Sequence, residues 1–163
     1  MIGFKATRDL KCRDTQFEIG GEYTINGTLE LCKNGFHFCK NVGDVFRYYM
    51  NDAVVVKVEA FDVIDGDDKS CCRTIKILEL LNGNYDNYWF KDGKLHREDG
   101  PAVENRDYKA WYLNGLLHRE DGPAVEDDGR KIWYLNNLLH REDGPAIEEG
   151  DFKEWWINGI RQK

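Results

Sequence analysis

Four tryptophans divide the second half of the chain into segments of equal length. Trp89, Trp111, Trp133 and Trp155 are each 22 residues apart, and the octapeptide Leu-His-Arg-Glu-Asp-Gly-Pro-Ala recurs unchanged at 95–102, 117–124 and 139–146. A fixed period of this length is typical of repeat architectures, in which one unit buries its apolar face only against its neighbours. We therefore predict three 22-residue units, 89–110, 111–132 and 133–154, with a partial unit at 155–163 that covers the last open face.

Each unit has the pattern of a β-hairpin. Asn114-Gly115 follows a short aromatic strand, and this dipeptide favours a type I′ turn because both positions accept positive φ. Asp92-Gly93 and Asn158-Gly159 repeat the signal, whereas Asn136-Asn137 is a weaker copy that still tolerates the left-handed conformation. The array is therefore predicted to be all β.

The His-Arg-Glu-Asp tract of each unit places a histidine beside carboxylates, which suggests a metal or catalytic site at His96, His118 and His140. If each unit adds two strands, equivalent atoms of stacked units lie about 9–10 Å apart. Zinc ligands lie about 2.0–2.3 Å from one ion, so histidines of neighbouring units cannot share a metal. We predict instead that the tract fixes turns, with each arginine pairing with its own Glu or Asp, and that a partner-binding face is the alternative.

Residues 1–84 show no repeat and are predicted to form an α+β domain with one main helix, ahead of the all-β array at 85–163. The helix is expected at about 43–51, because Val42, Val45, Phe46 and Tyr49 form an apolar stripe at helical spacing. The alternation of apolar residues and the turn signals predict strands at 2–6, 17–25 (around a Gly-Gly turn), 29–32, 35–39, 53–64 and 71–81.

Composition constrains the expected ligands and cellular location of the protein. Its formal net charge is −7 and neither half has a basic stripe, so direct nucleic-acid binding is not expected. The longest aliphatic run, Val54-Val55-Val56, is too short to span a membrane, and the start lacks the apolar segment of a secretion signal. Cys71 and Cys72 are adjacent in a predicted strand, where side chains alternate between faces, so a disulfide framework is not expected. These features predict a cytoplasmic protein.

Cys32, His37 and Cys39 are the candidate reactive residues of the first half. A metal site would need a fourth ligand, which Cys12, Cys71 or Cys72 could supply, but the spacing of these residues matches no common zinc module. A nucleophilic pair of Cys39 and His37 would need hydrogen-bond contact and an acid behind the histidine. Buried free thiols with a hydrogen-bonded histidine are the simpler interpretation, so no catalytic residue, metal or cofactor is assigned.

Two resemblances rest on specific motifs. The units resemble MORN-type repeats, and more closely their Trp-Tyr-x-Asn-Gly-x-Leu-His-Arg-x-Asp-Gly-Pro-Ala variant in phage, giant-virus and bacterial proteins, although Asp-Gly-Pro-Ala stands where the MORN repeat ends in Gly-x-Gly. Residues 2–81 resemble a domain of phage and prophage proteins without assigned activity, through Gly3-Phe-Lys-Ala6, Cys32-x-Asn-Gly-Phe-His-Phe-Cys39 and Asp44-Val-Phe-x-Tyr-Tyr49. The resemblance implies a phage context and action in the host cytosol. Lipid binding is not carried over from MORN proteins, because anionic membranes would repel an acidic array.

These features favour a non-enzymatic protein-binding module. The resemblance to small acidic phage proteins implies an inhibitor of a host defence system, such as an anti-CRISPR protein, with a host or defence-system protein as its partner. Interfaces favour aromatic residues, and an acidic face suits a basic partner. The predicted binding face therefore consists of Tyr112, Tyr134, Trp155, Trp156, Glu126, Asp127 and Asp128.

Two other functions remain open. In the first alternative, the N-terminal domain is an enzyme that uses Cys39 and His37 as a catalytic pair or that transfers ADP-ribose. A Gly-Phe-His-Phe strand, a helix with Tyr48-Tyr49 and a Val-rich strand occur in the order that resembles small ADP-ribosyltransferase-like folds, with Glu59 or Glu79 as the acid. In the other, the array is a structural element that self-associates through its exposed end.

Overall fold

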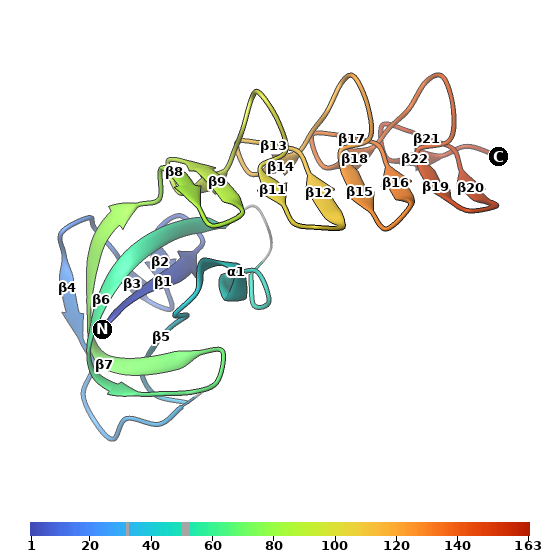
Figure 1. The fold of residues 1–163 in the computed structure, drawn as a ribbon. Helices are drawn as coiled ribbons and strands as arrows, with labels where there is room; N and C mark the ends of the chain where they lie inside the picture. The colour runs from blue at the N-terminus through green and yellow to red at the C-terminus, as the bar shows by residue number, and fades with distance from the viewer. Residues whose placement is uncertain (32, 50–52) are drawn as a thin grey trace. The chain divides into compact units, whose positions relative to one another are not determined.

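The computed structural model describes residues 1–31, 33–49 and 53–163. The chain divides into two compact units, one formed by Met1–Asn82 with Asp92–Lys94 and the other by Gly83–Lys91 with Leu95–Lys163. Strands dominate both units, and a single short helix occurs among the described residues (Figure 1). The chain is therefore mostly β, and its C-terminal part consists of antiparallel hairpins.

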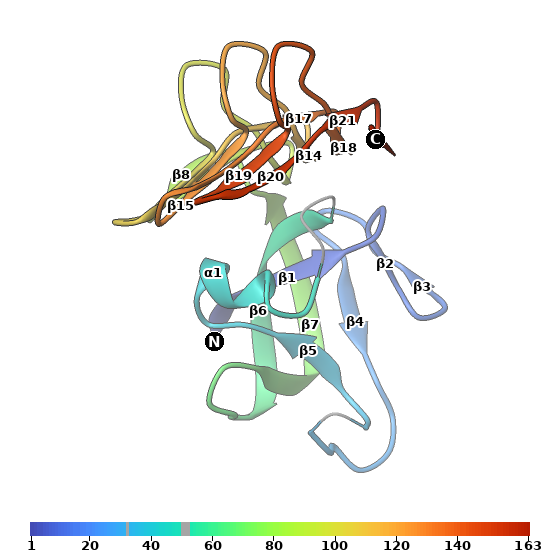
Figure 2. The ribbon, with the colours of Figure 1, turned by 90° about the vertical axis from the view of Figure 1, so that its right-hand side faces the viewer.

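A five-stranded antiparallel sheet frames the first unit (Figure 2). Its order is β1-β6-β7-β4, and β5 pairs with the part of β7 that β4 leaves free. Phe4 and Cys39 exchange two backbone hydrogen bonds of 2.8 Å, which link β1 to the end of β5. Hydrogen bonds thus connect β1, β6, β7 and β5 in a closed circuit. The strands are β1 (Ile2–Thr7), β4 (Glu22–Thr24), β5 (Phe36–Phe38), β6 (Val54–Ile64) and β7 (Ser70–Leu80).

The long hairpin of β6 and β7 supplies most of the core of the first unit. Its two strands agree with the strands predicted at 53–64 and 71–81, and the valine alternation is confirmed by the burial of Val56 and Val58. A smaller hairpin joins β2 (Lys11–Cys12) to β3 (Thr15–Gln16). Burial of the apolar side chains on β6 and β7 drives the first unit to fold. The core consists of Phe17, Phe36, Phe38, Val56, Val58, Ala60, Cys72, Ile75 and Ile77.

The helix is much shorter than the predicted 43–51. Helix α1 spans Val42–Val45, and residues 50 and 51 of the expected segment lie outside the described residues. The Asn41 side chain bonds the Asp44 carboxylate instead of capping a backbone N–H. Val42 and Val45 are buried, but Tyr49 is 42% exposed, so the expected stripe does not continue onto the core. Without a side-chain cap and with an aromatic-rich second turn, the sequence sustains only one turn.

The strand predicted at 29–32 is also wrong over its described part. Glu30 forms an isolated bridge with Asn34, and Lys33 and Asn34 both donate backbone hydrogen bonds to the Glu30 carbonyl. The Asn34 side chain holds the preceding loop through the carbonyls of Asn26 and Thr28. These local bonds satisfy the backbone groups that a strand would have paired, so the segment is a turn.

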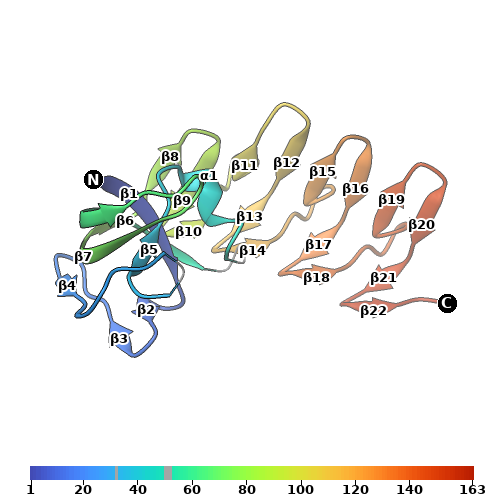
Figure 3. The ribbon, with the colours of Figure 1, turned by 90° about the horizontal axis from the view of Figure 1, so that it is seen from below.

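The second unit is built around a nine-stranded antiparallel sheet (Figure 3). Its order is β10-β9-β11-β12-β15-β16-β19-β20, with β8 paired to β9. The pairs β11–β12, β15–β16 and β19–β20 therefore follow one another across the sheet in the order of the sequence. The strands are β8 (Gly83–Tyr85), β9 (Tyr88–Lys91), β10 (Lys94–Leu95), β11 (Val103–Glu104), β12 (Tyr108–Ala110), β15 (Val125–Asp127), β16 (Arg130–Ile132), β19 (Ile147–Glu149) and β20 (Phe152–Glu154).

Three two-stranded hairpins accompany this sheet. Their turns have positive φ at both central positions, 51° and 82° at Asn114-Gly115 and 51° and 64° at Asn136-Asn137. This confirms the predicted turn conformation, including the weaker copy. Asn137 compensates for the missing glycine, because its side-chain oxygen accepts the Leu117 backbone N–H at 2.7 Å. The hairpins pair β13 (Tyr112–Leu113) with β14 (Leu116–Leu117), β17 (Tyr134–Leu135) with β18 (Leu138–Leu139), and β21 (Trp156–Ile157) with β22 (Ile160–Arg161).

Candidate functional site

A cavity of about 270 Å³ opens on the first unit between β1, β5 and the segment that follows α1. One part of its wall is apolar and aromatic and comes from Phe4, Phe38, Val45, Tyr48 and Tyr49. The polar part consists of Lys5, His37, Cys39 and Lys69. The cavity thus brings together the reactive pair and the tyrosine pair that the sequence singled out. No carboxylate occurs among the described residues that line it.

Lys5 is the unusual member of this wall, because its side chain is only 3% exposed. Its ammonium donates a hydrogen bond of 2.8 Å to the His37 carbonyl. Strand β1 is fixed on both sides, by β6 and by the Phe4–Cys39 bridge, so the backbone at Lys5 has little freedom. Burial lowers the pKa of Lys5, since water no longer stabilises the charged form.

His37 and Cys39 are placed together but not in the protonation states of a nucleophilic pair. Burial, helped by the positive charges of Lys69 and Lys5, lowers the pKa of His37 to about 4, so its ring is neutral at pH 7. Burial raises the pKa of the Cys39 thiol to about 11. A cysteine nucleophile reacts as the thiolate, and this thiol is protonated at pH 7. The environment therefore favours an unreactive buried thiol.

The two tyrosines border the mouth of the cavity, and both are more than 40% exposed. The Tyr48 hydroxyl donates a hydrogen bond of 2.5 Å to Asp68, which raises the pKa of Tyr48 to about 12. The Lys69 ammonium lies 4.2 Å from the centre of the Tyr48 ring, within the range of a cation–π contact. These contacts hold the Tyr48 ring in one orientation beside the cavity.

A wider depression of about 680 Å³ continues from the cavity, with which it shares Lys5, Ala6, His37 and Tyr49. It adds three further cations, Arg8, Lys11 and Arg13, and one acid, Asp9. Sequence reasoning missed this group because it looked for a stripe over a whole half of the chain. The signal was local: four of the nine residues from Lys5 to Arg13 are basic, with Asp9 as their only acid.

A metal site is not apparent in the described part of the chain, where no group of three or more His, Cys, Asp or Glu side chains is arranged around a common point. Cys32, one of the three candidate ligands, lies outside the described residues. Cys71 and Cys72 are fully buried, and burial raises the pKa of the Cys72 thiol to about 12. Of the two glutamates proposed as a transferase acid, Glu79 forms an ion pair with Lys57 at 3.3 Å.

In the second unit, the arginine of each His-Arg-Glu-Asp tract holds its own loop. The Arg119 guanidinium lies 4.0 Å from the centre of the Trp111 ring and donates to Asp121 at 2.8 Å and to the Pro123 carbonyl at 3.2 Å. The bond from Arg119 lowers the pKa of Asp121. Arg97 and Arg141 make the equivalent contacts with their own tryptophan, aspartate and proline. The predicted pairing of arginine with its own carboxylate is thus confirmed.

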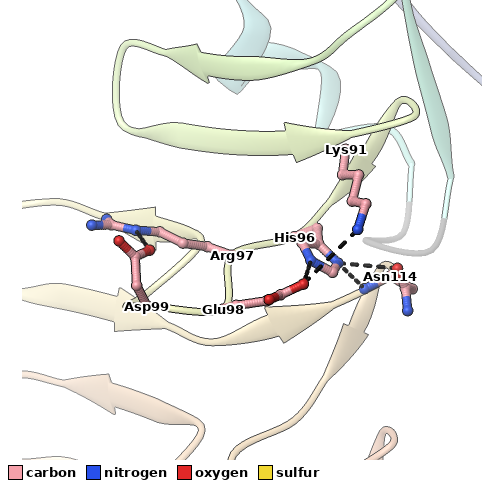
Figure 4. A network of polar contacts seen from close by, with 6 residues as sticks. All are labelled: Lys91, His96, Arg97, Glu98, Asp99 and Asn114. Atoms are coloured by element: carbon pink, nitrogen blue, oxygen red, sulfur yellow. Dashed lines mark hydrogen bonds and ion pairs between the residues drawn. The ribbon is translucent and has the colours of Figure 1, made fainter.

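The histidine of each tract connects one hairpin to the next. His96 Nδ1 lies 3.0 Å from the Asn114 side-chain oxygen and accepts the Asn114 backbone N–H at 3.0 Å (Figure 4). On the other side of the ring, Nε2 lies 3.2 Å from Glu98. His118 Nδ1 and His140 Nδ1 lie 2.9 Å from the side-chain oxygens of Asn136 and Asn158, and His140 also accepts the Asn158 backbone N–H at 3.2 Å. Both ring nitrogens of His96 thus have polar partners, as expected for a residue that fixes turns.

The aromatic half of the predicted binding face needs correction at Tyr112. This side chain is 1% exposed and is among the largest fully buried groups of the chain, so it cannot contact a partner. It lies on β13 and pairs with Leu117, and burial of its ring contributes to the core of the array. Tyr134 and Trp156 are half-buried, whereas Trp155 is 49% exposed.

The acidic residues of the predicted binding face also differ in their surroundings. Glu126 is held by Arg119 through an ion pair of 3.2 Å. Asp127 ends β15 and Asp128 occupies the following turn with a φ of 41°, and both are exposed. Sequence reasoning missed the more exposed glutamates of the tracts, Glu98, Glu120 and Glu142, whose side chains are 75–84% exposed. Their position in three identical octapeptides was the signal.

A groove of about 700 Å³ lies between two successive loops of the array. Trp111 and Leu113 contribute its apolar surface. Arg97, Glu98 and Asp99 line it from one loop, and His118, Arg119, Glu120 and Asp121 from the next. Both arginines are engaged with their own tryptophans and aspartates, whereas the exposed carboxylates of Glu98 and Glu120 lie 3.2 and 3.7 Å from the Nε2 atoms of His96 and His118.

Comparison with known proteins assigns the first part of the chain to a family. None of the helices described is long and apolar enough to cross a membrane. No curated protein and no solved structure matches the chain. Residues 1–85 match a family described as a domain of unknown function, DUF7666. This match covers the whole five-stranded sheet, the cavity and the cationic depression, and the chain therefore belongs to the DUF7666 family.

Proposed function

We propose that this protein is a phage or prophage accessory protein that acts in the host cytosol as a non-enzymatic protein-binding module. Its target is a component of a host defence system, in the manner of anti-CRISPR inhibitors. The 22-residue units are MORN-like repeats whose loops form the recognition surface. The proposal is supported by the repeated contacts of arginine, tryptophan, histidine and asparagine, which make the array stiff, since a rigid surface binds with little loss of conformational entropy.

One observation carries the proposal: the groove between successive loops combines an apolar floor with exposed carboxylates. Trp111 and Leu113 provide area that a partner side chain can cover, while Glu98 and Glu120 extend into solvent. Charged groups of this kind steer partners of opposite sign and exclude those of like sign. The partner that fits is a protein segment with lysines or arginines alternating with apolar residues.

Charge reversal at the loops tests this proposal. Glu98→Lys, Glu120→Lys and Glu142→Lys together turn the proposed surface basic. The control, Asp14→Lys with Glu18→Lys and Asp67→Lys, makes the same change in net charge at exposed positions of the first unit. Both variants and the wild type are used to capture proteins from host lysate, and circular dichroism verifies their folding. We expect the wild type and the control to recover the same partner and the loop variant to lose at least about 90% of it, because reversed charges at a surface repel the partner. Equal recovery by all three proteins would exclude the loops as the interface.

The enzymatic alternative draws support from the cavity, which places His37, Tyr48 and Tyr49 together. Its support is weaker because no described lining residue is a carboxylate, and because the Cys39 thiol is protonated at pH 7. ADP-ribose transfer is tested by incubating the protein with labelled NAD and host lysate. Label on a host protein would favour the transferase over a binding module.

A further inference from the structure

The cavity and the depression of the first unit form a surface rich in cations, although the chain as a whole is acidic. Lys5, Arg8, Lys11, Arg13 and Lys69 line this continuous surface, against the single acid Asp9. Among the described residues, none of the five cations forms an ion pair with a carboxylate, whereas every tract arginine of the array does. Five cations with only Asp9 on the surface and Asp68 beside Lys69 as nearby carboxylates leave an excess of like charge, which raises the free energy of the unit. An anion bound on this surface would lower it.

Lys5 is the strongest sign that this surface is a binding site. An ammonium that is 3% exposed has lost most of its hydration, and its oxygen partner is the neutral carbonyl of His37. Burying a charge is unfavourable unless an opposite charge compensates for it. Lys5 lines both the cavity and the depression, so a ligand that occupies both brings its negative group to this ammonium.

The cavity itself suits a flat ring rather than another charge. Its apolar wall includes Phe4 and Phe38, and the Tyr48 ring is held by Asp68 and Lys69. A volume of about 270 Å³ is at the lower end of the range of roughly 300–1,000 Å³ that is usual for small-molecule sites. It therefore accommodates one ring system, while the remainder of a larger ligand lies over the depression. Aromatic side chains stack on nucleobases irrespective of their sequence.

We propose that the first unit binds a free nucleotide, with the base in the cavity beside Tyr48 and Tyr49 and the phosphates against Lys5, Lys11 and Arg13. The site is independent of the loop surface of the array. Arginine and lysine are the common ligands of phosphate, arginine through its planar fork and lysine as a point charge. Tyr49, exposed at the junction of cavity and depression, contacts the ligand where the base joins the sugar.

Calorimetric titration of the full-length protein tests the proposal with four nucleoside diphosphates, ADP, GDP, CDP and UDP, and with adenosine, inorganic phosphate and a ten-residue oligothymidylate. We expect at least one diphosphate to bind at least about tenfold more tightly than inorganic phosphate, because base stacking adds to the phosphate contacts. Lack of binding by all four at 1 mM (on the order of the weakest usual Kd) would overturn the proposal. So would equal affinity for inorganic phosphate, which marks a simple anion site, or preferred binding of the oligonucleotide.

Variants at exposed positions keep the test independent of folding. Lys11→Gln with Arg13→Gln removes two cations from the depression, and Tyr49→Ala removes an exposed ring. Each variant is expected to weaken diphosphate binding by about tenfold or more, since each removes charged or stacking contacts. Arg106→Gln with Lys131→Gln removes two exposed cations from the other unit and is expected to change affinity by less than about twofold, through screened long-range charge alone. Equal weakening by this control would show that only net charge matters and would overturn the site.

Discussion

Burial lowers the pKa of Lys5 below its ordinary value of 10.5, because the folded chain disfavours the ammonium form. Between the lowered pKa and 10.5, the unfolded state binds the proton more strongly than the folded state does, so the contribution of Lys5 to stability rises with pH across this window. We expect the unfolding free energy of the wild type, minus that of Lys5→Met, to increase between pH 7 and pH 10.5. Urea denaturation of both proteins at several pH values measures it. A difference that stays constant over this range would contradict the prediction.

At the same scale, sequence reasoning located reactive residues better than it judged their surroundings. The Gly-Phe-His-Phe-Cys motif correctly brought His37 and Cys39 to one site, because residues two apart on a strand share a face. The lysine at position 5 was not singled out, since nothing local distinguishes an inward-facing lysine from a solvated one. Tyr112 was wrongly placed on the surface: its side chain is 1% exposed, and a local strand pattern does not reveal which aromatic side chains of an array become buried.

At the scale of the element, the loop of each array unit depends on a glycine that leaves room for the arginine. A Cβ on Gly122 would lie 2.9 Å from the Arg119 Cζ, and Gly100 and Gly144 stand in the same relation to Arg97 and Arg141. The backbone at Gly122 does not have positive φ, so an alanine there is not strained in itself. The guanidinium would have to leave the Trp111 ring and its bonds to Asp121 and Pro123.

A double-mutant cycle separates this contact from other effects. Gly122→Ala is expected to lower the unfolding free energy by about 1–2 kcal/mol, because the cation–π contact and hydrogen bonds of Arg119 are disturbed. In the Arg119→Ala background the same change is expected to cost less than about 0.5 kcal/mol, since the clash is gone. Denaturation by urea measures all four proteins. A similar loss in both backgrounds would mean that the glycine serves another purpose.

The strands and the helix show where element prediction succeeds. Strands β6 and β7 were predicted nearly to their ends, because the valine alternation and the Asp65-Gly66 turn specify a hairpin locally. The segment after α1 has the spacing of an amphipathic helix, but the chain leaves the helix after one turn and presents Tyr48 and Tyr49 at the cavity. Apolar spacing alone does not reveal that these rings border a site instead of filling a core.

At the scale of the whole molecule, a part of the first unit comes from beyond the family match at residues 1–85. Asp92–Lys94 belongs to the first unit, and Gly93 accepts the Val55 N–H at 2.7 Å and donates to the Leu81 carbonyl at 2.8 Å. Both Val55 and Leu81 are fully buried. The predicted boundary between 84 and 85 could not include this return, because the hydrogen bonds join residues that are far apart in the sequence.

These bonds predict that a fragment of residues 1–85 is less stable than a fragment of residues 1–96. In the shorter fragment the Val55 N–H and the Leu81 carbonyl lose their partners, and a buried polar group without a partner costs about 1–3 kcal/mol. Each 1 kcal/mol shifts the Tm of a domain of this size by about 4–8 °C, so we expect the Tm of the shorter fragment to be at least about 8 °C lower, measured by circular dichroism. Gly93→Ala in the longer fragment is the matched control. Its Cβ would lie 2.8 Å from the Val55 carbonyl oxygen at a φ of +76°, so it should lower the Tm by displacing the same bonds without shortening the chain. Equal Tm values for the two fragments would show that residues 1–85 already form a complete folding unit.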